Sequence, residues 1–134
     1  MLSRYRQLSP EERADLFPAT FRLLIVQCLI LFGIQRTASW LGTLGSARPS
    51  ELNVEAWTRR SRALSRTSRL IPGARCLSRA MALRWWMRQS GIPAELVIGA
   101  GSGPTGLRSH AWVEANGQRF DTGEAQPLTE IQRY

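Results

Sequence analysis

The chain lacks lysine altogether, and it has only one histidine and two cysteines among its 134 residues. Two cysteines cannot make a disulfide framework, and with a single histidine they are too few for a four-ligand structural zinc site. We therefore expect a cytoplasmic protein that uses neither a metal nor another cofactor.

Arginine supplies all of the positive charge, since 18 basic residues against 10 acidic residues leave a formal net charge of +8. Such an excess favours polyanionic partners, namely an acidic peptide, a membrane surface or nucleic acid. We do not favour nucleic acid, because the arginines are not interleaved with stacking aromatic residues.

The length and the 43% hydrophobic content indicate a globular chain with one core. We expect a helical N-terminal segment, residues 1–50, followed by a core, residues 51–134. The two segments are expected to form one continuous domain. The apolar run Leu23–Ile34 has 12 residues and contains Gln27. This run is too short to span a bilayer.

The N-terminal segment shows clear helix signals. Ser9 and Pro10 are typical of a helix start, and Pro18 predicts a kink or a break. From about Thr20 the segment is apolar nearly all round, which indicates either burial or docking on a recognition protein, a cyclase or a lipid surface. Cys28 is expected to be a small buried hydrophobic residue.

A second helix is expected over residues 53–70, where Trp57, Leu64 and Ile71 recur every seven residues and predict the buried face. Four arginines at three-four spacing form a basic stripe, which is either a solvated face or a docking strip for an acidic peptide or a partner protein. These are Arg59, Arg62, Arg66 and Arg69.

The segment from Cys76 onward carries the chemistry. Cys76 opens a strongly helical run that ends at Gly91, which suits a helix C-terminal cap. A short apolar strand, residues 95–98, and a glycine-rich loop, residues 99–108, come next. His110, the only histidine, then opens a second strand. A thiol at a helix N-terminus and a nearby imidazole are the parts of a cysteine nucleophile with its base.

The pair Asn116-Gly117 is the strongest two-residue hairpin signal available. With these residues as the turn, Trp112 lies opposite Asp121, and His110 shares that face of the hairpin because side chains alternate along a strand. Asp121 is then the diagonal neighbour of His110 and within reach of it. The turn therefore predicts a carboxylate beside the imidazole.

Roles follow from this placement. Cys76 is the candidate nucleophile, since the helix N-terminus and an adjacent imidazolium both lower a thiol pKa. His110 is the candidate general acid and base, and Asp121 orients its ring, with Glu124 as the alternative third group. Trp112 and the basic stripe are candidates for substrate binding.

The motifs themselves resemble a known family. The segments C-L-S-R-A from Cys76, G-I-P-A-E-L-V-I-G from Gly91 and H-A-W-V-E from His110 resemble the transglutaminase-like cysteine protease superfamily. More narrowly, they are similar to the stand-alone leader peptidases of lasso-peptide biosynthesis, the protease part of the B protein. The resemblance covers about residues 72–121.

The resemblance implies an α+β fold with a papain-like or transglutaminase-like core, in which a cysteine-bearing helix packs on a small antiparallel sheet after N-terminal helices. It also implies a Cys76–His110–Asp121 triad that removes the leader from a ribosomally made precursor peptide. The partners that it implies are that precursor, a separate leader-recognition protein and a downstream cyclase.

Two alternatives stay open. The first is acyl transfer to an amine, of the transglutaminase or acetyltransferase type. The second is a basic adaptor without catalysis, which binds an acidic leader or a membrane surface. The adaptor would show salt-sensitive binding and an ordinary thiol pKa at Cys76.

Overall fold

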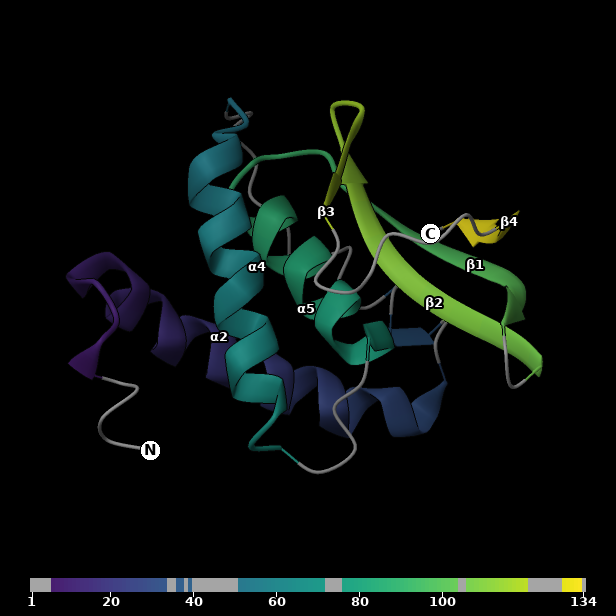
Figure 1. The fold of residues 1–134 in the computed structure, drawn as a ribbon, viewed down its shortest axis with the longest axis horizontal. Coiled ribbons are helices and arrows are strands. Elements are labelled where there is room, and N and C mark those ends of the chain that lie inside the picture. The colour runs from purple at the N-terminus through teal and green to yellow at the C-terminus, as the bar shows by residue number, and fades with distance from the viewer. Residues whose placement is uncertain are drawn as a thin grey trace.

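The protein is described by a computed structural model that covers residues 6–33, 36, 37, 39, 51–71, 76–103, 106–120 and 129–133. Three long helices and a sheet make up this part of the chain (Figure 1). The helical elements are α2 (Pro10–Leu29), the short 3-10 helix η1 (Ile30–Phe32), α4 (Val54–Ser68) and α5 (Cys76–Gln89). The strands are β1 (Glu95–Gly103), β2 (Gly106–Ala115), β3 (Gln118–Phe120) and β4 (Thr129–Arg133).

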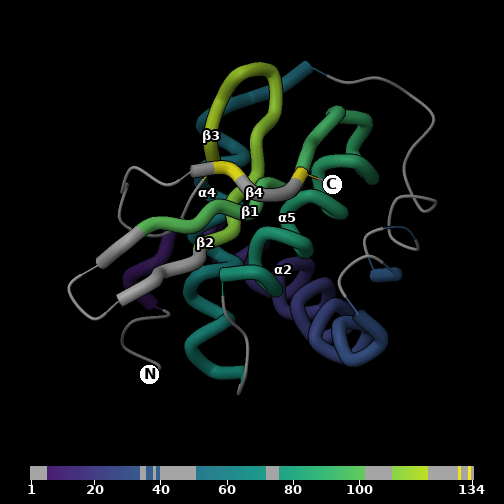
Figure 2. Tube along the Cα trace, turned by 90° about the vertical axis from the view of Figure 1, so that its right-hand side faces the viewer, coloured from purple at the N-terminus to yellow at the C-terminus, as the bar shows by residue number. Residues whose placement is uncertain are grey.

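The sheet is antiparallel with the strand order β3-β2-β1-β4. Helix α5 lies between α4 and the sheet, and α2 lies at the opposite end of the molecule from the β2–β3 turn (Figures 1 and 2). The expected α+β architecture, with a cysteine-bearing helix packed on a small antiparallel sheet, is therefore confirmed.

One hydrophobic core joins the helices to the sheet. Leu23 of α2, Leu64 of α4, Met87 of α5 and Val113 of β2 are all at most 1% exposed and belong to the same cluster. Burial of this kind supplies most of the helices' stability, because isolated helices of this length are marginal in water. The N-terminal helix thus contributes to the same core as the cysteine-bearing helix.

Helix α2 begins as its sequence predicts. The Ser9 side chain accepts a hydrogen bond from the Glu12 backbone N–H, and the Glu12 carboxylate accepts one from the Ser9 backbone N–H at 2.8 Å. This capping box satisfies two donors that the helix itself leaves unpaired. The helix is not split at Pro18, because Leu23 and Val26 beyond the proline are buried against the rest of the core.

Two expectations for the N-terminal segment are wrong. Cys28 is exposed, because α2 buries only the face that carries Ala19, Leu23 and Val26. The apolar segment is also longer than 12 residues, since the helix continues from Pro10 to Phe32 and is long and apolar enough, by length and composition, to cross a membrane. Its buried face instead packs in the core of the domain.

The glycine-rich segment is strand rather than the expected loop. Strand β1 runs on to Gly103 and pairs residue by residue with β2, which starts at Gly106 and not at His110. Antiparallel pairing satisfies the backbone N–H and C=O groups whatever the side chains are, so pairing outweighs the low strand preference of glycine.

Candidate active site

Cys76 is the first residue of α5, at the helix end where backbone N–H groups point outward. Its thiol is half-buried. Two residues later the Ser78 hydroxyl donates to the Gln27 side-chain oxygen of α2 at 2.6 Å. This hydrogen bond ties the first turn of α5 to α2 and so holds the cysteine in place.

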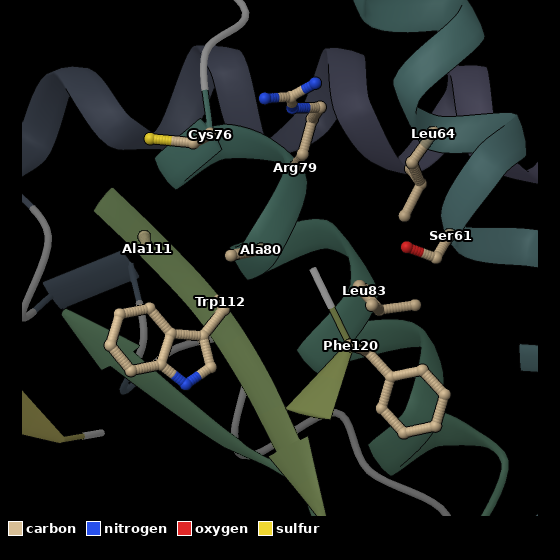
Figure 3. Close-up of a pocket in the computed structure, with 9 residues that line it drawn as sticks. All are labelled: Ser61, Leu64, Cys76, Arg79, Ala80, Leu83, Ala111, Trp112 and Phe120. Atoms are coloured by element: carbon tan, nitrogen blue, oxygen red, sulfur yellow. The ribbon is translucent and has the colours of Figure 1, made fainter. Parts of the chain in front are cut away.

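A pocket opens directly beside Cys76 (Figure 3). Its empty space is about 240 Å³ when the open solvent at its mouth is included, and its enclosed part is much smaller. Its walls come from α4, α5, β2 and β3. The lining residues are Ser61, Leu64, Cys76, Arg79, Ala80, Leu83, Ala111, Trp112 and Phe120.

Trp112 links this pocket to the only histidine. Its indole lines the pocket, and it stacks with the His110 ring at 6.4 Å between centroids and 24° between planes. His110 also precedes Ala111, which lines the same pocket. Its partner across the sheet is Gly99, which has no side chain to compete for the space beside the imidazole. Trp112 thus connects the half-buried imidazole to the pocket beside Cys76, and the pairing of that imidazole with the thiol stays a prediction.

The third member of the triad stays a prediction. The observed pairs Val113 with Phe120 and Glu114 with Arg119 are those expected from the two-residue turn. Asp121 and Glu124, the two candidates for the third group, lie outside the described residues.

Trp112 itself is held firmly. It is only 6% exposed, and the Arg119 guanidinium lies 4.0 Å from its ring centroid. Such a cation–π contact adds to the packing of the indole. The candidate substrate-binding tryptophan is therefore a rigid wall of the pocket.

The basic stripe is divided between internal and exposed arginines. Arg59 donates to the buried Asp15 carboxylate of α2 at 2.6 Å, which raises the pKa of Arg59. Arg66 lies 3.4 Å from the Glu12 carboxylate of the same helix. In the described part of the chain, Arg62 and Arg69 are exposed and make no ion pair. Half of the stripe therefore fastens α4 to α2, and the other half faces solvent.

Arg84 of α5 is buried, although arginine favours the surface. Arg84 is 5% exposed, and its burial lowers its pKa to about 10. Arg88 donates to the Ala94 backbone oxygen at 2.9 Å and so connects the end of α5 to the approach to β1. Both side chains serve the packing of α5 on the sheet.

Comparison with known proteins places the chain in a family. A model of the transglutaminase-like superfamily matches residues 23–133. The chain belongs to this superfamily. Its members are in general cysteine peptidases or acyltransferases, in keeping with a cysteine that lies at a helix start and lines a pocket. No curated protein and no solved structure matches the chain.

Seven of the nine lining residues were not predicted as site residues from the sequence, and they come from four different elements, α4, α5, β2 and β3. Ser61 comes from α4, Arg79 from α5 and Phe120 from β3. The only local signal concerns Arg79, which lies three residues after Cys76 and hence on the same helix face.

Proposed function

We propose that this protein is a cysteine endopeptidase that removes the leader from a ribosomally synthesised precursor peptide, as in lasso-peptide maturation. The observation that carries the proposal is the pocket in which Cys76 at the start of α5 meets Trp112, the stacking partner of His110. Membership of the transglutaminase-like superfamily supports thiol chemistry at this place.

In the proposed reaction His110 takes the proton of the Cys76 thiol, and the thiolate attacks the carbonyl carbon of the scissile peptide bond. The backbone N–H of Cys76, at the helix N-terminus, donates to the oxyanion that forms. His110 then protonates the leaving amine, which is the new N-terminus of the core peptide. Water hydrolyses the thioester and releases the leader, while Asp121 keeps the imidazole oriented.

Mass spectrometry separates hydrolysis from acyl transfer. The full chain is incubated with the precursor peptide, a separate recognition protein and an excess of glycine ethyl ester. We expect two fragments whose masses sum to that of the precursor plus one water, because water is the acceptor. A leader fragment that carries the added amine would instead establish the acyltransferase alternative.

The partner surface in this proposal is a stripe of apolar side chains on the outer face of α2 and η1. These residues recur at three-four spacing, which is the pattern of a helix contact. The outer stripe consists of Phe17, Phe21, Leu24, Cys28 and Leu31. Phe17 is 79% exposed and Leu31 is 85% exposed. Soluble monomers rarely expose apolar patches of this extent without a binding role.

We assign the outer stripe to the separate leader-recognition protein, with the cyclase and a lipid surface as alternatives. Gln27 is the neighbour of Cys28 in α2, and it accepts the hydrogen bond from Ser78 in the first turn of α5. A protein bound to the stripe therefore lies next to the helix that begins with Cys76. This is where a bound leader has to be presented.

Leu24→Asp is expected to weaken binding of the recognition protein about 10-fold to 100-fold, because it buries an unpaired charge in an apolar contact. Calorimetric titration of the full chain measures the affinity. Leu70→Asp is the matched control, since Leu70 is 62% exposed and lies just after α4, away from the stripe. If Leu24→Asp weakens binding to anionic vesicles but leaves binding of the recognition protein unchanged, the stripe binds a lipid surface instead.

A further inference from the structure

The pocket beside Cys76 contains a guanidinium with an unsatisfied donor. The Arg79 Nε atom is buried and has no hydrogen-bond partner among the described residues. Its Nη1 atom makes one long hydrogen bond, 3.4 Å, to the Ser65 hydroxyl of α4. A buried N–H without a protein acceptor is costly unless a water or a ligand supplies one, and of the four such atoms in the described residues only the Arg79 Nε belongs to the lining of this pocket.

Ser61 supplies a second polar group to the same pocket. Its side chain is 5% exposed, and in Figure 3 its hydroxyl oxygen points toward the interior of the pocket. Within the described part of the chain this hydroxyl makes no hydrogen bond. Ser61 is therefore available to donate to a group that enters the pocket.

No carboxylate of the described residues compensates this arginine. Among them the lining contains neither aspartate nor glutamate, and Arg79 forms no ion pair. By contrast, Arg59 and Arg66 each pair with a carboxylate of α2. A cationic donor and a hydroxyl donor thus line the same small pocket, and each is complementary to a carboxylate.

We propose that this pocket binds the side chain of an aspartate or glutamate of the precursor, and that Arg79 and Ser61 thereby select the substrate. The inference rests on the proposed function, since it assigns a subsite of the same peptidase. The net charge of +8 also favours approach of an acidic peptide.

The position of the acidic residue follows from the geometry of α5. Arg79 lies three residues after Cys76, so its backbone is about 4.5 Å further along the helix. An extended peptide advances about 3.3 Å per residue, which places the selected side chain within about three residues of the scissile bond. The leader precedes the core, so the leader carries the carbonyl group that forms the thioester with Cys76. We therefore assign the selected residue to the C-terminal end of the leader.

Three pairs of acetylated tripeptidyl chloromethyl ketones test the pocket. Each pair varies one of the three positions, with glutamate in one probe and glutamine in the other, and the remaining positions are alanine or glycine. Intact-mass spectrometry measures the alkylation rate of Cys76 in the full chain, and peptide mapping uses the exposed Cys28 as the internal reference for non-selective alkylation. At one position we expect the glutamate probe to react about tenfold faster than its glutamine counterpart.

Variants of Arg79 show whether its guanidinium causes the preference for glutamate over glutamine. Arg79→Gln is expected to bring that ratio to about one, and Arg79→Lys to retain part of it. Arg36→Gln removes an exposed arginine outside the pocket and the basic stripe as the control matched in charge, and it should leave the ratio unchanged. Iodoacetamide, which has no peptide side chains, measures the reactivity of the Cys76 thiol itself in each variant, and the ratio of glutamate to glutamine rates is independent of that reactivity.

The possible results distinguish a failure of the carboxylate pocket from a failure of the proposed peptidase function. Equal rates within all three pairs, in a wild-type protein that still labels Cys76 selectively, overturn the carboxylate pocket and leave the peptidase standing. An equal fall of the ratio in Arg36→Gln assigns the preference to overall charge and overturns the role of Arg79. Labelling of Cys76 no faster than that of Cys28 by all six probes overturns the peptidase together with its subsite.

Discussion

Replacement of Cys76 by alanine is expected to abolish cleavage of the precursor, with a loss of at least about 1,000-fold, while the protein stays folded. The thiol is the only group proposed to form the covalent bond to the substrate, so its loss removes the reaction path itself. The side chain is half-buried at a helix start, so its truncation leaves only a small gap in the packing. Chromatographic separation of leader and core measures the first effect, and urea denaturation measures the second.

Leu70→Ala is the control for this experiment, because Leu70 is exposed and lies outside the pocket and the outer stripe. Cleavage by Cys76→Ala at the wild-type rate would contradict the peptidase and the acyltransferase alike. Absence of cleavage by the wild-type protein as well would instead favour the basic adaptor, which needs no catalysis. A thiol titration of the wild-type protein adds an independent measurement, since an adaptor predicts an ordinary pKa for Cys76.

Features that depend on local chemistry could be predicted from the sequence. Ser9 marks the start of α2 because a side-chain oxygen there satisfies backbone donors that no other helical residue reaches. Asn116 and Gly117 both have positive φ, 49° and 75°, as the two-residue turn requires. That turn also determines the pairing of β2 with β3, so the placement of Trp112 on the His110 face followed from two residues.

Features that depend on distant contacts could not be predicted. Cys28 is apolar enough for a core, but which face of α2 is buried depends on where α4 and α5 pack. Arg84 is buried although its charge favours the surface, because α5 is enclosed between α4 and the sheet. The long pairing of β1 with β2 likewise exists only once both strands are present.

The same distinction between local and distant contacts applies to the candidate active site. Cys76 and His110 could be selected from their motifs, because each motif lies within a few residues. The pocket could not, since Ser61 reaches it from α4 and Phe120 from β3. Nothing in the sequence near Arg79 shows that its Nε lacks an acceptor, because that depends on every element around it.

Leu23→Ala is expected to lower the free energy of unfolding by about 2–5 kcal/mol, because it leaves a cavity at a side chain that is 0% exposed. Leu24→Ala changes the same residue type one position along the same helix, but Leu24 is 49% exposed on the outer stripe. Its cost should be below about 1 kcal/mol. Urea denaturation of both full-length variants gives the comparison directly.

The comparison of Leu23→Ala with Leu24→Ala shows whether α2 is a structural part of the core. If α2 were only a detachable anchor for a membrane or a partner, both substitutions would be equally mild, and this result would contradict its place in the core. A large cost at Leu23 with a small cost at Leu24 means that the helix has two independent faces. One face then supports α5 and the position of Cys76, and the other is left to bind the protein that presents the leader.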